Sequence, residues 1–253
     1  MAVPPARPES RLYRVIAKIV RPLMFSMCRY EWSGSENLPA EGGFIAAANH
    51  VTELDALTFV HYLFDQGFEP RVLAKRSLFT APVVGSVLRG TNMIPVDRGS
   101  AAAARSLQRA GDELGDGACV AVFPEGTLTR DPDCWPMEPK TGLARIALTT
   151  RLPVVPVAQW GAVDILPRYG KLPRLFPRKR VQVVAGPPVD LSDLYERPQD
   201  AATLREVMNR VMDAITVLLA DLRDEQPPAH RFDLRKHPDY EVKKMTYPPV
   251  ERP

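Results

Sequence analysis

The sequence predicts an α/β fold: one domain with a mostly parallel central sheet flanked by helices, preceded by an N-terminal amphipathic helical segment. Short apolar runs alternate with amphipathic helical stretches along most of the chain, as expected when helices cover both faces of a parallel sheet. A chain of 253 residues can bury the core of such a domain. Hydrophobic residues make up 45% and charged residues 25%, which is typical of folded globular proteins.

The chain divides by composition into three parts. Residues 1–30 form a basic, amphipathic helical segment, residues 31–225 form the α/β domain, and residues 226–253 form a Pro-rich, polar tail. In the first part, basic residues recur at helical spacing on one face, and Pro22 predicts a break or kink before a short apolar stretch. The segment is expected to lie in a membrane interface through Arg11, Arg14, Lys18, Arg21, Leu23 and Phe25. The alternative is a helix that packs on the protein's own core.

Within the domain, six buried strands and five helices are expected. Apolar runs with branched side chains predict strands at residues 44–48, 71–74, 93–96, 119–123, 154–157 and 181–185. Amphipathic periodicity predicts helices at residues 55–64, 81–88, 100–114, 140–150 and 201–224.

Charge and cysteine content narrow the class of protein. The net charge of +3 is too small to indicate a nucleic-acid partner, but residues 168–180 carry six basic side chains and no acid. This segment could contact anionic lipid, hold the phosphates of coenzyme A, or simply be solvated. Three cysteines without metal-type spacing fit a reducing compartment. No apolar run reaches a transmembrane length, and no signal peptide is predicted.

The segment from Phe44 to Leu57 offers a general base. His50 follows a predicted buried strand, and Asp55 lies one turn further on, where Thr52 and Asp55 fit a capping box at the start of a helix. Neutral imidazole can accept a proton from a hydroxyl, and a carboxylate can fix its tautomer. The alternative is an ordinary loop histidine beside a helix cap.

Other strand ends carry polar residues that could converge with His50, since ligands bind beyond the carboxyl ends of parallel strands. Arg98 can grip a phosphate through its planar guanidinium or can pair with Asp97 at a turn. The run Glu125-Gly126-Thr127 offers a carboxylate, a close backbone approach and a hydroxyl, or is an ordinary turn. Lys75 is either solvated or a substrate contact.

Several chemistries are not predicted. The chain has no Gly-x-Ser-x-Gly elbow, no P-loop and no Gly-x-Gly-x-x-Gly. No second histidine lies at a ligand spacing from His50, so no metal site is expected.

Four motifs in order resemble the glycerolipid acyltransferase family, of the 1-acyl-sn-glycerol-3-phosphate acyltransferase type, over residues 30 to 190. The His-x-x-x-x-Asp motif is His50 to Asp55 with Asn49 before it, and the arginine-bearing motif is Ile94 to Arg98. The Phe-Pro-Glu-Gly-Thr motif is Phe123 to Thr127, and the Val-Pro strand is Val155 to Val157. One departure is that Leu128 stands where the family usually has arginine, and the next arginine is Arg130.

The resemblance implies an enzyme of phospholipid biosynthesis. It would move a fatty acyl group from acyl-CoA or acyl-carrier protein to a lysophospholipid, most directly 1-acyl-glycerol 3-phosphate, and need no other cofactor. His50 and Asp55 would be catalytic, and the substrate-binding residues would be Asn49, Arg98, Glu125, Gly126, Thr127, Lys75 and Arg130. The protein would be peripheral or monotopic on the cytoplasmic face of the cell membrane. The alternatives are another lyso-lipid or polar acceptor, or a non-catalytic lipid-binding protein of the same fold.

Overall fold

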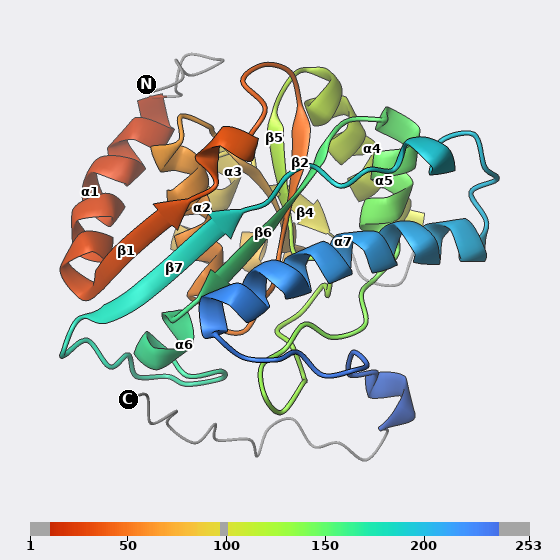
Figure 1. Cartoon of the computed structure of the whole chain (residues 1–253). Helices are drawn as coiled ribbons and strands as arrows, with labels where there is room; N and C mark the ends of the chain where they lie inside the picture. The colour runs from red at the N-terminus through yellow and green to blue at the C-terminus, as the bar shows by residue number, and fades with distance from the viewer. Residues whose placement is uncertain (1–10, 97–100, 238–253) are drawn as a thin grey trace.

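A twisted sheet runs through the middle of the molecule, with helices on both of its faces (Figure 1). The computed structural model describes residues 11–96 and 101–237. The strands of this part of the chain are β1 (Cys28–Ser33), β2 (Phe44–Ala48), β3 (Arg71–Lys75), β4 (Ile94–Val96), β5 (Cys119–Val122), β6 (Val154–Trp160) and β7 (Lys179–Ala185). They form one sheet in the order β1-β7-β6-β2-β5-β3-β4.

The α-helices of the described residues connect these strands. They are α1 (Arg11–Met27), α2 (Asp55–Asp65), α3 (Pro82–Gly90), α4 (Ala101–Gly115), α5 (Gly142–Thr150), α6 (Ala162–Ile165) and α7 (Ala201–Arg223). Short 3₁₀ helices are η1 (Ser35–Asn37), η2 (Arg76–Thr80), η3 (Ser192–Leu194) and η4 (Leu234–Lys236). The predicted α/β class with a mostly parallel sheet is confirmed, and the predicted strands and helices fall within a few residues of the observed ones.

Burial of the central strand on both faces explains its apolar sequence. All five residues of β2 are buried. Because side chains alternate along a strand, Ile45 and Ala47 pack with α4, α5 and α7, whereas Phe44, Ala46 and Ala48 pack with α2 on the opposite face. The carboxyl end of β2 is therefore held rigidly from both sides.

The direction of the sheet reverses once, between β6 and β7. β2 pairs in parallel with β5 and β6, but β6 and β7 are antiparallel, and β1 is parallel to β7. After β6 the chain passes close to β7 at Gly161, whose φ is 100° and where a Cβ would lie 2.0 Å from the Arg180 carbonyl oxygen. Only glycine fits such a position. The starts of β1 and β7 consequently lie at the same edge of the sheet as the carboxyl end of β2.

Two details of the N-terminal region differ from the prediction. β1 was not predicted, because Cys28–Ser33 is an edge strand of mixed polarity in which buried and exposed positions alternate with no apolar run. The prediction that Pro22 breaks the helix is wrong, since α1 continues through Pro22 to Met27. Pro22 is exposed, so water can satisfy the carbonyl group that its missing N–H leaves unpaired.

The division of the chain at residues 30 and 225 stays a prediction. Residues 226–237 run back over the surface, where the Glu138 N–H donates to the Phe232 carbonyl at 2.9 Å. The Arg231 guanidinium pairs with Asp213 on α7.

Candidate functional site

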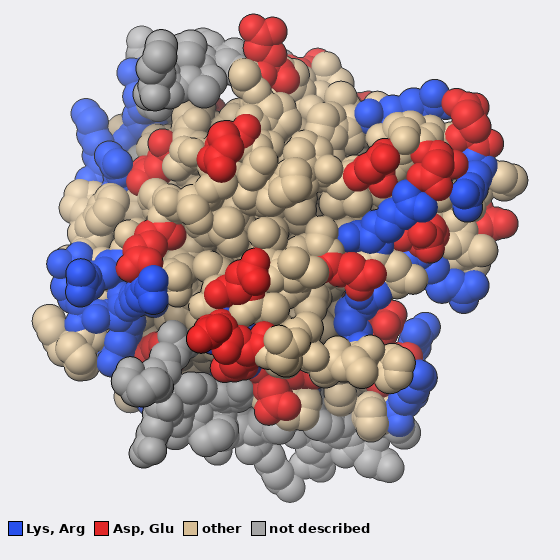
Figure 2. Space-filling view, viewed as in Figure 1, with Lys and Arg blue, Asp and Glu red and all other residues tan. Residues whose placement is uncertain are grey.

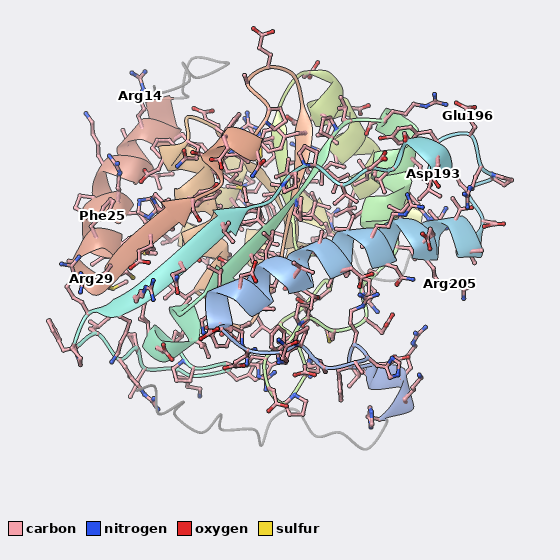
Figure 3. All side chains as sticks on the ribbon, in the orientation of Figure 1. Arg14, Phe25, Arg29, Asp193, Glu196 and Arg205 are labelled. Carbon is pink, nitrogen blue, oxygen red and sulfur yellow. The ribbon has the colours of Figure 1, made fainter. Side chains whose placement is uncertain are left out.

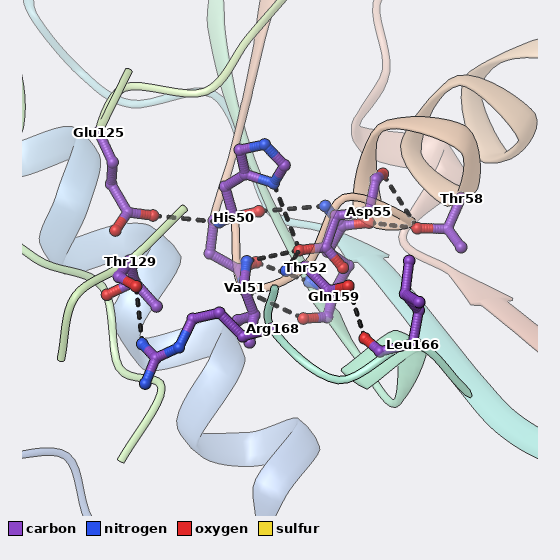
Figure 4. A network of polar contacts seen from close by, with 11 residues as sticks. His50, Val51, Thr52, Asp55, Thr58, Glu125, Thr129, Gln159, Leu166 and Arg168 are labelled. Carbon is purple, nitrogen blue, oxygen red and sulfur yellow. Dashed lines mark hydrogen bonds and ion pairs between the residues drawn. The ribbon is translucent and has the colours of Figure 1, made fainter. Parts of the chain in front are cut away.

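The imidazole of His50 lies at the carboxyl end of β2, in the loop that leads to α2 (Figure 4). Its ring stacks on Phe123 with 4.0 Å between the ring centroids and 17° between the planes. Its Nδ1 lies 3.4 Å from Asp55 Oδ2, and its side chain is 15% exposed. With Nδ1–H directed at the carboxylate, Nε2 carries the lone pair and can accept a proton.

The carboxylate of Asp55 is fixed by the loop that it closes. Its Oδ2 accepts hydrogen bonds from the Val51 and Thr52 backbone N–H groups, the second at 2.8 Å. The predicted capping box is therefore only half formed. The Thr52 hydroxyl instead donates to the Leu166 carbonyl at 2.6 Å, because the loop after α6 packs against it.

Asn49 ties the site to the neighbouring strand β6. Its side chain is buried, its Nδ2 donates to the Gln159 carbonyl at 3.0 Å, and its Oδ1 accepts the Gln159 N–H at 2.9 Å. The Gln159 side chain donates to the Asn49 carbonyl and accepts from the Thr58 hydroxyl on α2. The side-chain amide of Asn49 is therefore bonded to β6, and this bonding fixes the backbone just before His50.

Glu125 joins the loop after β5 to the loop after β2. Its side chain is fully buried, its Oε1 accepts the His50 N–H at 3.0 Å, and its Oε2 accepts the Met137 N–H at 3.1 Å. Both oxygens accept from backbone N–H groups, and the contact of Glu125 with an acceptor stays a prediction. Removal from water raises the pKa of Glu125 to about 8, against the opposing effect of the two N–H donors.

The backbone of His50 is also held by Thr129, which Arg168 holds in turn. The Thr129 N–H donates to the His50 carbonyl at 2.6 Å. One guanidinium nitrogen of Arg168 donates to the carbonyl groups of Thr129 and Asp131 at 2.7 and 2.8 Å. Arg168 is 4% exposed, so it supports the loop that holds His50 and is not solvated like a member of a surface basic segment.

The remaining predicted site residues differ in their exposure and in their contacts. Gly126 is exposed, its φ is 70°, and its N–H already donates to the Phe123 carbonyl at 2.9 Å. Thr127 is half-buried, and Lys75 is exposed at the end of β3. Arg130 is half-buried, with its guanidinium carbon 5.7 Å from the ring centroid of Tyr169. Arg98 lies outside the described residues.

Leu128 marks the departure from the expected motif. Leu128 is 6% exposed, and its apolar side chain offers no charge to a ligand at this position. The next arginine along the loop is Arg130.

The residues that sequence reasoning missed are Phe123 as a stacking partner, Gln159, Thr58, Thr129 and Arg168. Only Phe123 belonged to a motif that pointed to the site. Gln159 and Arg168 lie 110 and 118 positions from Asn49 and His50 respectively, so that only the folded sheet brings them together.

No metal cluster accompanies these residues in the described part of the chain. Among residues 11–96 and 101–237, no group of three or more His, Cys, Asp or Glu side chains is arranged to hold a metal ion. The three cysteines are free and buried.

Replacing Glu125 by glutamine is expected to change how stability depends on pH. The folded pKa of about 8 lies above the ordinary pKa of a glutamate side chain, 4.5, so between these values the folded protein holds a proton that the unfolded chain releases. Wild-type stability should therefore fall as the pH rises through this window, by at most about 1.4 kcal/mol per pH unit. Glu125→Gln cannot titrate, and its stability relative to the wild type should rise from pH 5 to pH 8.

Urea unfolding at several pH values measures this difference. Asp221→Asn, an exposed change on α7, is the matched control and should show no such trend. A stability difference between Glu125→Gln and the wild type that stays constant with pH would contradict the buried, protonated carboxyl group.

Comparison with known proteins agrees with the geometry of this site. The acyltransferase family model matches residues 29–160, which contain His50, Asp55 and Glu125. A 1-acyl-sn-glycerol-3-phosphate acyltransferase of Bacillus subtilis is 27% identical over 201 residues, which cover 79% of this chain and 94% of that protein. A protein of the same name from Borreliella burgdorferi is 35% identical over 126 residues, 49% of this chain and 48% of its own length.

A solved structure supports the fold. The crystal structure of the 1-acyl-sn-glycerophosphate acyltransferase PlsC from Thermotoga maritima superposes with a TM-score of 0.62 at 24% identity, covering 85% of this chain and 81% of that one. With its α/β sheet, its His50–Asp55 pair and a family match over more than half of its length, this chain belongs to the acyltransferase family.

Proposed function

We propose that this protein transfers a fatty acyl group from an acyl thioester to the hydroxyl of a lysophospholipid, most directly 1-acyl-glycerol 3-phosphate, giving phosphatidic acid. The observation that carries the proposal is the contact of His50 Nδ1 with Asp55 Oδ2 at 3.4 Å, which leaves Nε2 to accept a proton. The names of the relatives favour this acceptor. The donor would be acyl-CoA or acyl-carrier protein.

The proposed reaction needs no covalent acyl-enzyme. His50 Nε2 removes the acceptor's hydroxyl proton as the oxygen attacks the thioester carbonyl, and Asp55 stabilises the imidazolium that forms. The tetrahedral intermediate then collapses, the C–S bond breaks, and the departing thiolate takes the proton back from His50. The Gly126 N–H already donates to Phe123, so the oxyanion of the intermediate needs another donor from the loop that begins there.

For the acceptor's phosphate we propose Arg98, Thr127 and Arg130, with Lys75 at the outer end of β3. The Nε of Arg130 is buried and has no hydrogen-bond partner within the described residues, and the guanidinium lies two residues beyond the buried Leu128. Because the arginine is displaced from its usual position in the motif, acceptors such as a lysophosphatidylinositol or glycerol 3-phosphate belong in the same test.

We propose that α1 brings the protein to the membrane that holds this acceptor. One side of α1 packs on the body through Tyr13 and Met24. On its outer side Val15, Ile19 and Leu23, spaced four residues apart, are 54%, 68% and 56% exposed. Burial of such a stripe in a lipid interface removes apolar surface from water.

The predicted basic contacts of α1 differ in their surroundings. Arg14 and Lys18 are exposed, and Figure 3 shows Arg14 projecting from the start of the helix. Arg21 forms an ion pair with Asp65 of α2 at 3.0 Å, and Phe25 packs edge-on against Tyr30 and His61. Arg11 begins the helix.

The proposed location is the cytoplasmic face of the cell membrane, with the protein attached peripherally. No helix in the described ranges combines the length and the apolar character needed to cross a bilayer. The exposed stripe on α1 suits docking on one leaflet.

Release of free thiol from palmitoyl-CoA measures the reaction directly. With vesicles that contain 1-acyl-glycerol 3-phosphate, release is expected to depend on this acceptor and to yield phosphatidic acid. Parallel assays with lysophosphatidylinositol, glycerol 3-phosphate and an acyl-carrier-protein donor rank the alternatives. Folded protein that releases no thiol with any of these pairs would refute acyl transfer and favour a lipid-binding protein.

A further inference from the structure

Residues 169–178, which we call the basic loop, present two large apolar side chains to solvent beside three cations. Leu172 and Phe176 are 82% and 85% exposed, more than any other described large hydrophobic side chain. The cations are Lys171, Arg174 and Arg178, and the loop has no acidic residue. Side chains of this size are rarely left so open in a soluble protein unless the surface has a partner.

The loop is held at several points along its length. The Gly170 N–H donates to the Pro167 carbonyl and the Arg174 N–H to the Ile165 carbonyl, both at 2.6 Å. Leu175, which lies between Arg174 and Phe176, packs inward against a cluster that contains Met24 and Ile165. Leu172 and Phe176 therefore project from a loop that hydrogen bonds and the packing of Leu175 hold against the rest of the protein.

The far end of the loop is joined to the end of α1. The Arg178 guanidinium donates to the carbonyl groups of Phe25 and Cys28, the second at 2.7 Å. Figure 1 shows the loop between α6 and β7 beside the last turn of α1. The loop is thus attached to the end of the helix, where Leu23 is 56% and Phe25 38% exposed.

The charge around the loop favours an anionic partner. Among the described residues, the exposed side chains of Lys171 and Arg174 form no ion pair, whereas the nearby Arg180 is paired with Glu31 at 2.6 Å. Figure 2 shows Lys and Arg side chains gathered at this edge of the molecule. Exposed Phe and Leu beside unneutralised cations match the interface of a bilayer, with apolar acyl chains beneath anionic headgroups.

The topology of the sheet places this surface beside the catalytic residues. The loop lies between β6 and β7, at the edge where β2 delivers His50. The residues just before the loop are bonded to the site. The Leu166 carbonyl accepts from the Thr52 hydroxyl, and Arg168 donates to the carbonyl of Thr129, whose own N–H donates to the His50 carbonyl.

We propose that the basic loop inserts Leu172 and Phe176 into an anionic phospholipid bilayer as a second contact beside α1, which turns the His50 edge of the sheet toward the lipid. The inference rests on the proposed function, since a substrate embedded in a membrane gives this orientation its use. Binding to vesicles is nevertheless measured without donor or acceptor, so its failure is distinguishable from a failure of acyl transfer.

Flotation of the full chain with vesicles of phosphatidylcholine containing about 30% phosphatidylglycerol tests the apolar contact. The double variant Leu172→Ser/Phe176→Ser is expected to lower the partition coefficient about ten-fold or more, because two exposed apolar side chains no longer enter the bilayer. Val217→Ser, at a 61% exposed position on α7, is the matched control and should bind like the wild type. Unchanged binding of the double variant overturns the proposal.

The charged contact has its own variant. Lys171→Gln/Arg174→Gln should weaken binding to anionic vesicles about ten-fold and leave the weaker binding to pure phosphatidylcholine unchanged. Arg145→Gln/Arg205→Gln removes two exposed charges elsewhere and should have little effect. Equal losses for the two pairs would show that overall charge, and not the loop, attracts the protein.

Depth of insertion distinguishes the bilayer from a protein partner. Fluorescence of Phe176→Trp, corrected for the three native tryptophans, should shift to the blue with anionic vesicles and be quenched by lipids brominated on the acyl chain. Val217→Trp should show neither effect. A blue shift that depends on protein concentration without vesicles would identify a second copy of this chain as the occupant and overturn the proposal.

Discussion

Replacing His50 by alanine is expected to lower acceptor-dependent thiol release at least ~100-fold, because an alcohol hydroxyl at neutral pH needs a base in contact to become a nucleophile. Alanine keeps the backbone N–H that donates to Glu125 and the carbonyl that accepts from Thr129, so the loop should keep its position. The measurement is the initial rate of thiol release at saturating palmitoyl-CoA and 1-acyl-glycerol 3-phosphate.

The control is His230→Ala, which removes an exposed histidine from the C-terminal part of the chain and should retain the wild-type rate. Thermal unfolding of both variants shows whether the fold is intact. If a folded His50→Ala protein releases thiol at the wild-type rate, His50 is not the base and the proposed mechanism is wrong.

Asp55→Asn should also lower kcat, by about 10- to 100-fold and by less than His50→Ala does, because Asp55 acts on the reaction only through His50. One oxygen of Asp55, Oδ2, faces His50 Nδ1 and also accepts from the Val51 and Thr52 N–H groups. The asparagine oxygen is therefore expected to take the place of Oδ2, so that the loop and the tautomer of His50 are kept. What is lost is the negative charge that stabilises the imidazolium in the transition state.

Separate values of kcat and KM distinguish this effect from a structural one. Loss of the charge should lower kcat and leave KM within a few-fold, whereas a displaced loop would also weaken substrate binding. Glu53→Gln, an exposed carboxylate two residues away, is the matched control and should be nearly neutral. A fully active Asp55→Asn protein would show that Asp55 only caps the helix.

The parts of the fold that were predictable are those whose sequence pattern is set by burial on both faces. Phe44–Ala48 and Cys119–Val122 are apolar throughout because helices cover the sheet on either side, and such runs stand out in a sequence. Cys28–Ser33 has one face exposed and lies at the edge of the sheet, so its pairing with β7 depends on a partner about 150 residues away. No local pattern contains that information.

The His50–Asp55 contact could be predicted from the sequence, but the residues that hold it in place could not. The spacing of His50 and Asp55 identified the pair that the structure brings to 3.4 Å. The same sequence gave no indication that Glu125 is buried and binds backbone, since a carboxylate is normally solvated. Arg168 was grouped with a basic segment by charge alone, yet its burial depends on the carbonyl groups of a loop nearly 40 residues earlier.

The reversal between β6 and β7 bears on which substrate concentration determines the rate of the enzyme. It brings the end of α1, the loop before β7 and the end of β2 to one edge of the sheet. In the proposed orientation, the acceptor reaches His50 by lateral diffusion within a leaflet and never crosses water. The rate would then follow the number of acceptor molecules per unit of membrane area, and diluting that lipid with inert phospholipid would slow the enzyme even at a constant bulk concentration.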